Sequence, residues 1–290
     1  MNNSTNDTID NLYNNFIFIY MYKIIMEKAP YILLIDLDGT IQGDITPQLK
    51  EYVLQKSLGV KLNKKLLAID YKKGLLRPYF KDFMNMIDTD YKNKVELFVY
   101  TASEKKWANY IVPIIESVTN VKFNRPIFTR EQCNMNNMTE KVKSISIVKP
   151  AIIKTLKKQY KSITNNDIIN KIYLIDNNYV LKEANFLIKC PTYDKAIFIN
   201  VLRTIDDNIK QSKFKDICKV ILNYDCNNKW EMMQRIYDDA FKKFIYYDEK
   251  NSVYENDTFW EKVKFVFENN KQHNMKVIIN HLKEIIKVTV

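Results

Sequence analysis

The sequence predicts an α/β fold in which helices cover both faces of a parallel sheet. Three apolar runs, Tyr31 to Ile35, Val95 to Tyr100 and Ile172 to Ile175, lack the polar alternation of half-exposed strands, as is typical of strands buried on both faces. Segments with apolar residues at helical spacing separate the runs, which indicates that helices connect the strands. Polar residues follow each run directly, so we expect a site at the carboxyl edge of the sheet, where such folds place their ligands.

Helices fill most of the chain between these strands. In chain order we expect a helix over 47–57 with Thr46 as its cap, a basic hairpin or insertion over 58–76, a helix over about 79–88 with Pro78 at its start, a helix over 104–117 that Pro113 kinks or ends, a short strand over 126–129, and a basic helix over 151–160. These assignments rest on two preferences of helices: a hydroxyl residue caps the first turn, and proline suits the first turn but kinks or ends a helix in its interior. The short stretch between the first two long strands leaves room for little or no cap domain.

The composition changes along the chain and divides it into three parts. We expect residues 1–28 to be a partly disordered N-terminal segment, 29–212 to hold the sheet, and 213–290 to form a helical C-terminal extension. The extension carries the aromatic residues Trp230, Tyr237, Phe241, Phe244, Trp260, Phe265 and Phe267. Their helical spacing favours packing in a core over a platform on which nucleic-acid bases stack.

The net charge indicates an anionic partner. The chain has 45 Lys and Arg against 34 Asp and Glu, a formal charge of +11, which suits nucleic acid, a phosphorylated peptide or a phosphate ester. Only four glycines are present, Gly39, Gly43, Gly59 and Gly74. Their positions exclude the glycine-rich loops that bind nucleotide phosphates or dinucleotides.

Cysteine usage and hydropathy indicate an intracellular protein, without distinguishing nucleus from cytoplasm. The four cysteines form no C-x-x-C pair, so a zinc site is not expected, and we interpret them as free thiols of a reducing compartment. The apolar run over 17–26 is short and is interrupted by Lys23. It therefore predicts neither a signal peptide nor a membrane span.

Two aspartates one residue apart, Asp36 and Asp38, end the first apolar run. Carboxylates this close repel each other, and a hard divalent cation such as Mg²⁺ offsets that repulsion. Gly39 permits the sharp turn that follows, and the Thr40 hydroxyl can hydrogen-bond the loop. We therefore expect a magnesium site at this end of the strand.

The ends of the other two strands carry compatible groups. Thr101 and Ser103 follow the second strand, and Asp176 and Asn177 end the third. Because parallel strands end at one edge of a sheet, these side chains are expected to meet the aspartate pair. A basic stretch between these strands includes Lys149.

This combination resembles the haloacid dehalogenase-like (HAD) phosphotransferases, whose first motif is D-x-D-x-T. Further segments resemble the FCP1/SCP (NLI-interacting-factor) branch, the RNA polymerase II carboxy-terminal-domain phosphatases. They are Leu76-Arg77-Pro78 with Phe80 and Phe83, FVYTAS over 98–103 with Trp107-Ala108, FTREQC over 128–133, and IDNN over 175–178. The resemblance covers about residues 30–210 and implies a HAD-like Rossmannoid sheet. It departs at Gly39, where this branch commonly carries a glutamate, and after Lys149, where it usually carries K-D-L.

The resemblance implies roles for the site residues. Asp36 would be the nucleophile that forms an aspartyl-phosphate, and Asp38 the general acid and then base. Mg²⁺ would join the Asp36 carboxylate, the Asp38 backbone carbonyl and either Asp176 or Asn177.

The remaining roles concern phosphate and substrate. Thr101 would donate hydrogen bonds to phosphoryl oxygens, and Lys149 would supply positive charge in the transition state, with Lys141, Lys143 and Lys154 as competitors. Thr40, Ser103 and Arg77 are assigned to substrate binding, Arg77 with a structural role as the alternative.

Three functions are compatible with this sequence. The first is a Mg²⁺-dependent phosphatase acting on phosphoserine or phosphothreonine of a protein. The second keeps the chemistry but acts on a nucleotide or a polynucleotide phosphate end, as the charge would suit. The third is a catalytically idle HAD-fold binding subunit, against which the intact carboxylates and hydroxyl argue. The sequence leaves the oligomeric state open.

Overall fold

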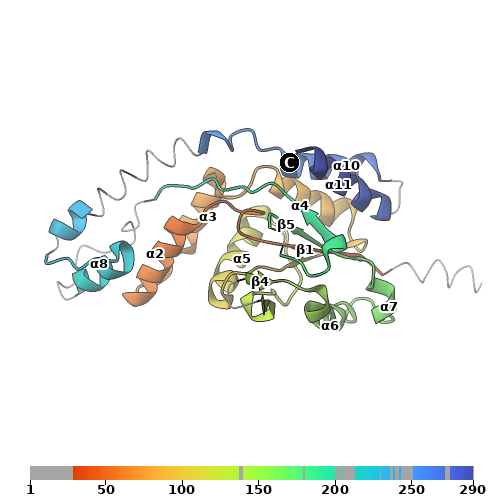
Figure 1. The fold of residues 1–290 in the computed structure, drawn as a ribbon, viewed down its shortest axis with the longest axis horizontal. Coiled ribbons are helices and arrows are strands. Elements are labelled where there is room, and N and C mark those ends of the chain that lie inside the picture. Colours follow the sequence, from red (N-terminus) through yellow and green to blue (C-terminus); the bar gives the residue numbers. More distant parts are fainter. Residues whose placement is uncertain are drawn as a thin grey trace, which may run out of the picture.

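A four-stranded parallel sheet lies at the centre of the molecule (Figure 1). The computed structural model describes residues 29–136, 140–178, 180–199, 203, 213–228, 230–235, 238, 242, 251–271 and 275–289. The strands run in the order β2 (Val95–Val99), β1 (Tyr31–Ile35), β5 (Ile172–Asp176) and β6 (Leu187–Lys189). The three strands expected from the apolar runs are therefore confirmed, and β6 is added at one edge. β1 lies between β2 and β5, and open α/β sheets bind their ligands at the carboxyl end of a strand in this position.

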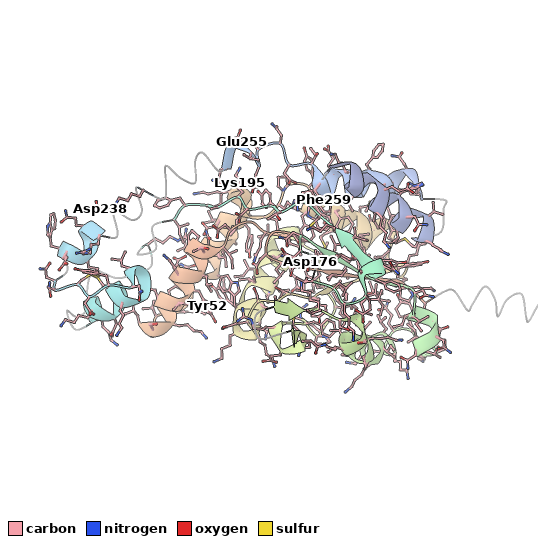
Figure 2. All side chains as sticks on the ribbon, viewed as in Figure 1. Tyr52, Asp176, Lys195, Asp238, Glu255 and Phe259 are labelled. Atoms are coloured by element: carbon pink, nitrogen blue, oxygen red, sulfur yellow. A yellow bond between two sulfur atoms is a disulfide. The ribbon has the colours of Figure 1, made fainter. Side chains whose placement is uncertain are left out.

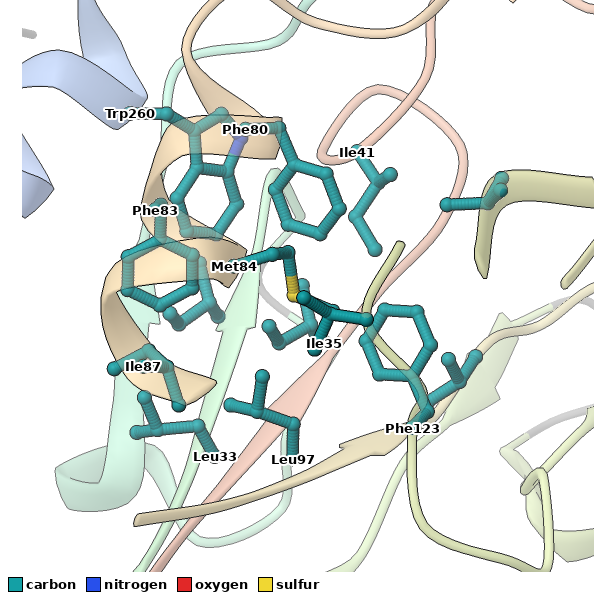
Figure 3. Close-up of a cluster of buried hydrophobic side chains, with 14 of the residues drawn as sticks. Leu33, Ile35, Ile41, Phe80, Phe83, Met84, Ile87, Leu97, Phe123 and Trp260 are labelled. Atoms are coloured by element: carbon teal, nitrogen blue, oxygen red, sulfur yellow. The ribbon is translucent and has the colours of Figure 1, made fainter. Parts of the chain in front are cut away.

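Helices cover both faces of this sheet, as predicted. Leu33 and Ile35 of β1 point into a core shared with α4 (Phe80–Asp90), α5 (Lys105–Thr119) and α10 (Phe259–Asn269). Figure 3 shows this cluster, in which Phe80, Phe83 and Met84 of α4 lie with Trp260 over the strands. The alternate β1 residues Ile32 and Leu34 face a second core. That core is formed with α6 (Ile145–Leu156) and α7 (Asn165–Ile168). Burial on both faces explains why the strand sequence is apolar throughout.

The helices after residue 258, which lie in the predicted extension 213–290, pack in the same core as the sheet. Trp260 and Phe267 of α10 are fully buried, and α11 (Met275–Thr289) adds Ile278 and Ile279 to the cluster beside α4. These aromatics pack in a core, as expected from their helical spacing. Phe265 on the same helix is instead 62% exposed.

A smaller cluster lies away from the sheet. The helix α8 (Phe214–Leu222) packs on α2 (Thr46–Ser57) through Leu54 and Ile217 (Figure 1). Trp230, in the segment after α8, is 78% exposed. The other predicted core aromatics, Tyr237, Phe241 and Phe244, lie outside the described residues, as do residues 1–28.

Two local predictions differ from the structure. Residues 58–76, predicted as a hairpin or an insertion, form no hairpin: they contain α3 (Lys64–Asp70), which the Asn63 side chain caps, and a π-helix, η1 (Tyr71–Leu75). The segment over 126–129 makes only one bridge, between Tyr100 and Phe128. In addition, a hairpin of β3 (Asn134–Asn136) and β4 (Glu140–Val142) precedes α6. Pro113 lies on the exposed side of α5, so that helix continues through it.

The cysteines also differ from the prediction. Cys218 and Cys226 form a disulfide, whereas Cys133 and Cys190 are free thiols. The inference of a reducing compartment from four free thiols therefore loses its premise. Within the described part of the chain, no helix is long and apolar enough to cross a membrane.

Candidate active site

The two aspartates lie in the loop that follows the central strand. The Asp36 N–H donates to the Ile175 carbonyl at 3.0 Å, so Asp36 continues the register of β1 beside β5. Gly39 then adopts a φ of +77°, and a Cβ atom added there would lie 2.5 Å from Asn177 Nδ2. Only glycine allows both the left-handed backbone and this close approach. The turn thus brings the D-x-D loop directly against the end of β5.

Lys143 joins two of the predicted site carboxylates. Its Nζ lies 2.6 Å from Asp36 Oδ1 and 2.6 Å from Asp176 Oδ2, and all three side chains are buried. Asp176 is the last residue of β5 and is labelled in Figure 2. Asp36 and Asp176 are therefore brought to one ammonium group, as expected for residues at adjacent strand ends.

Of Lys149 and its alternatives for the predicted phosphate-binding cation, Lys143 is the lysine that contacts the site carboxylates. Lys143 directly follows β4, and its backbone is clamped by hydrogen bonds to Val180 (2.7 Å) and from Lys182 (2.9 Å). Lys149 lies farther along α6, on a helix that starts only after Lys143. Spacing alone could not identify the lysine, because the β3–β4 hairpin decides which residue enters the site.

Burial dominates the electrostatics of this group. It raises the pKa of Asp36 to about 7, with Lys143 opposing the shift and Asp176 and Asp38 reinforcing it. Burial works to lower the pKa of Lys143, but the charges of Asp36 and Asp176 outweigh it and hold that pKa above its ordinary value. One ammonium thus faces more carboxylates than it can neutralise, and the site favours a further positive charge.

The second aspartate is held by neighbours on both oxygens. Gln42 Nε2 donates to Asp38 Oδ1 at 2.6 Å, and the Ser103 hydroxyl donates to Asp38 Oδ2 at 2.6 Å. Tyr71 in turn donates its hydroxyl proton to Gln42 Oε1 at 2.5 Å. Ser103, predicted to bind substrate, therefore lies within the site and contacts Asp38. Sequence reasoning missed Gln42 and Tyr71, because neither belongs to a recognised motif.

Thr101 lies at the end of the neighbouring strand. Its N–H donates to the Phe128 carbonyl at 3.0 Å, and its buried hydroxyl accepts a hydrogen bond from the Ser103 N–H at 3.1 Å. The Tyr100 N–H donates to the Ile35 carbonyl at 3.0 Å. These bonds place the Thr101 hydroxyl at the same edge of the sheet as Asp36.

Thr40 is buried, and its hydroxyl supports the loop, while its contact with substrate stays a prediction. Its hydroxyl accepts from the Asn177 N–H at 3.1 Å and lies 3.5 Å from Cys190 Sγ. The Asn177 amide is occupied locally, since its Nδ2 donates to Thr192 and its Oδ1 accepts from Asn178. Of the alternative metal ligands Asp176 and Asn177, only Asp176 contacts the Asp36–Lys143 pair. Burial raises the pKa of Cys190 to about 11, so this thiol is no nucleophile at neutral pH.

Arg77 is structural, the alternative to its predicted role in substrate binding. Its guanidinium is fully buried and pairs with both carboxylate oxygens of Asp257 at 3.0 and 2.8 Å. It also donates to the carbonyls of Gly39 (3.4 Å) and Pro191 (2.9 Å). Arg77 therefore ties the segment before α10 to the D-x-D loop.

The donor set fits Mg²⁺. Among the residues that the structure describes, no three Asp, Glu, His or Cys side chains converge as a metal-binding group. Mg²⁺ commonly binds through one or two carboxylates and takes its other ligands from waters and substrate phosphate. Asp36 and Asp176 supply two buried carboxylates that already share one cation, Lys143.

The chain matches one family model and is similar to several solved structures. The family model described as NLI interacting factor-like phosphatase matches residues 31–196. A single-substitution variant of fission yeast Fcp1, an RNA polymerase II CTD phosphatase, bound to beryllium fluoride is 15% identical, with a TM-score of 0.34, over 93% of this chain and 66% of that one. A second structure of Fcp1 is 15% identical, with a TM-score of 0.34, over 92% and 72%. A HAD-superfamily hydrolase of subfamily IA from Geobacter sulfurreducens is 13% identical, with a TM-score of 0.28, over 53% and 81%.

The match to these structures is partial in length. The chain spans 66% of the first Fcp1 structure, just under two thirds of it. A search of the curated proteins found no match.

Proposed function

This chain belongs to the NLI interacting factor-like phosphatase family, and from that premise we propose that it is a Mg²⁺-dependent protein phosphatase that works through an aspartyl-phosphate. The family consists of HAD-type phosphoric monoester hydrolases. The observation that carries the proposal is the bridge from Lys143 to Asp36 and Asp176, 2.6 Å on each side.

In the first step an Asp36 carboxylate oxygen attacks phosphorus. The new oxygen–phosphorus bond forms as the bond to the ester oxygen breaks, and the leaving oxygen takes the proton of the Asp38 carboxyl. Lys143 and the Thr101 hydroxyl stabilise the negative charge on the phosphoryl oxygens. Phosphate stays on Asp36 while the alcohol leaves.

In the second step water regenerates the enzyme. Asp38, now ionised, removes a proton from water as the water oxygen bonds to phosphorus. The bond between phosphorus and Asp36 breaks, and inorganic phosphate leaves. Asp38 has then recovered its proton, so the cycle is balanced.

Mg²⁺ would be held by Asp36 and Asp176, with the Asp38 backbone carbonyl as a further ligand. When bound, it offsets the repulsion between carboxylate and phosphate and polarises the phosphoryl group. The geometry supports this assignment, because the two buried carboxylates of Asp36 and Asp176 share a single ammonium group, Lys143, at 2.6 Å each.

The proposed substrate is phosphoserine or phosphothreonine in a protein. It is supported by the family and by the sequence segments around Arg77 and FVYTAS that resemble carboxy-terminal-domain phosphatases. The net charge of +11 suits an acidic phosphopeptide and equally a nucleic-acid end. A phosphorylated oligonucleotide is therefore the competing substrate in the test.

Turnover of p-nitrophenyl phosphate tests the chemistry. We expect hydrolysis that requires Mg²⁺, stops on chelation and falls by at least about 100-fold in Asp36→Asn, because the nucleophile is lost. A wild-type protein as inert as Asp36→Asn would refute the proposal. Faster release of phosphate from phosphopeptides than from end-phosphorylated oligonucleotides would support a protein substrate. Faster release from the oligonucleotides would instead identify a nucleic-acid substrate.

A further inference from the structure

A buried chain of hydrogen bonds ends on the Asp38 carboxylate. Tyr71 donates to Gln42 Oε1 at 2.5 Å, and Gln42 Nε2 donates to Asp38 Oδ1 at 2.6 Å. Gln42 and Tyr71 are both buried, so neither group can exchange its partner for water. A buried polar chain of this kind holds its members in one arrangement. The reaction set out above assigns no role to either residue.

The donor of each hydrogen bond from Tyr71 to Gln42 and on to Asp38 can be assigned. Burial raises the pKa of Tyr71 well above its ordinary value, with the charge of Asp38 as the next cause, so the phenol keeps its proton and donates it. Because the amide oxygen of Gln42 accepts this bond, its NH₂ group is the part that faces Asp38. The reverse orientation would set a carbonyl oxygen against a carboxylate.

The backbone holds both residues in place. The loop that carries Gln42 pairs with the end of η1, since Gly43 N–H donates to the Leu75 carbonyl and Arg77 N–H to the Ile41 carbonyl, each at 2.9 Å. Tyr71 begins η1, a π-helix, and such turns are frequent at functional sites. Backbone hydrogen bonds therefore fix the positions of Tyr71 and Gln42 independently of their contact with Asp38.

We infer that Gln42 and Tyr71 are positioning residues, which orient the Asp38 carboxyl for proton transfer to and from the reacting oxygen. This inference rests on the proposed phosphatase reaction. An amide NH₂ can only donate, so Oδ1 of Asp38 stays an acceptor, and the proton of the neutral carboxyl resides on Oδ2. Oδ2 contacts the Ser103 hydroxyl at 2.6 Å, which can donate or accept and so tolerates both protonation states.

The leaving group distinguishes this role from simple packing. A poor leaving group such as phenolate or a serine alkoxide needs the proton of a general acid as it departs, whereas 2,4-dinitrophenolate departs without one. Loss of orientation at Asp38 therefore slows the first class of substrate and spares the second. A variant that merely loosens the core slows both by the same factor.

The experiment measures kcat/KM for phenyl phosphate and for 2,4-dinitrophenyl phosphate with Mg²⁺. We expect Tyr71→Phe and Gln42→Met each to lower kcat/KM for phenyl phosphate by about tenfold more than kcat/KM for the dinitrophenyl ester, because the general acid Asp38 is no longer held in the orientation for proton transfer. In an Asp38→Asn background the selective effect of Tyr71→Phe should disappear. Equal factors for the two esters, or a selective effect that persists without Asp38, would overturn the inference.

A matched tyrosine supplies the control. Tyr160 donates to Glu96 at 2.6 Å near the amino end of β2, whereas Asp38 lies beyond the carboxyl end of β1. Tyr160→Phe therefore removes a hydrogen bond of similar length that is remote from Asp38. It should leave the ratio of the two kcat/KM values unchanged. A wild-type protein inactive on both esters would instead refute the phosphatase reaction itself.

A crystal structure of Tyr71→Phe gives a readout independent of turnover. We expect the Gln42 amide to lose its fixed orientation and the Asp38 carboxylate to rotate. An Asp38 carboxylate unchanged in this variant would contradict the inference.

Discussion

At the scale of single residues, Lys143 is the side chain on which the site depends. It is the shared partner of Asp36 and Asp176, and the same cation is proposed to face the transferred phosphate. We predict that Lys143→Met lowers kcat by at least about 100-fold, the loss typical when one charge-stabilising donor is removed. Lys149→Met should retain nearly full activity. Steady-state kinetics on p-nitrophenyl phosphate would decide, and the reverse pattern would restore Lys149 to the role that the motif order suggested.

The aspartates were predictable from the sequence, whereas the lysine was not. Asp36 directly follows β1, Thr101 lies two residues after β2, and Asp176 ends β5, so local pattern alone places them at the carboxyl end of the sheet. Lys143 follows a hairpin, and its own backbone pairs with residues 180–182, far along the chain. Such a contact between distant segments leaves no periodic signal. For the same reason, the sequence pattern did not identify Gln42 and Tyr71 as neighbours of Asp38.

At the scale of elements, α10 offers two phenylalanines in opposite environments. Phe267 is fully buried against Phe83 and Tyr91, and Phe265 is 62% exposed. We predict that Phe267→Ala lowers the free energy of unfolding by about 3–5 kcal/mol because it leaves a cavity. Phe265→Ala should change it by less than about 0.5 kcal/mol. Urea denaturation measures both, and similar values would mean that α10 is not part of the core.

The start of α6 carries a second element-scale prediction. The Glu183 carboxylate accepts from the Ser144 hydroxyl and from the N–H groups of Ile145 and Ser146. Burial works to raise the pKa of Glu183, but these donors, with the Ser144 hydroxyl foremost, outweigh it and lower that pKa below its ordinary 4.5. The stability that Glu183 contributes is therefore present above pH 4.5 and is lost as pH falls through the lowered pKa.

The variant Glu183→Gln tests this cap. We expect it to cost about 1 kcal/mol near neutral pH, as for loss of a helix cap. The difference from wild type should shrink as unfolding is measured below pH 4.5, the ordinary pKa. A difference independent of pH would show that the carboxylate charge plays no part. Glu131→Gln, in an exposed pair with Lys105, is the control.

At the scale of the whole molecule, the helices α10 and α11 share a core with the sheet that carries the candidate site. Asp257 pairs with buried Arg77, and the Trp260 indole N–H donates to the Thr40 carbonyl at 3.1 Å. Arg77 also donates to the Gly39 carbonyl, in the loop that carries the proposed nucleophile, Asp36. The segment that enters α10 is thus fastened to the loop beside Asp36.

We predict that Asp257→Asn destabilises the protein by about 3–5 kcal/mol, because it leaves the Arg77 charge buried without its ionic partner. Glu261→Gln, at an exposed position of α10, should change stability by less than about 0.5 kcal/mol. Thermal unfolding monitored by circular dichroism compares the two. Equal melting temperatures for Asp257→Asn and wild type would contradict a clamp at this point.

The fold class was predictable from strand and helix periodicity, but the packing partners of the C-terminal helices were not. The amphipathic pattern after residue 213 identified helices correctly. It could not show that α10 and α11 share the core of β1 while α8 packs on α2, because an amphipathic pattern does not identify the surface against which the apolar face packs.

The most direct test of the central claim is the detection of phosphate on Asp36. The protein is mixed with p-nitrophenyl phosphate and Mg²⁺, quenched with acid within the first turnover and digested for mass spectrometry. The account predicts one phosphate on the peptide that contains Asp36, labile to hydroxylamine and missing from Asp36→Asn. Turnover without a covalent phosphate, or with the phosphate on another residue, would contradict it.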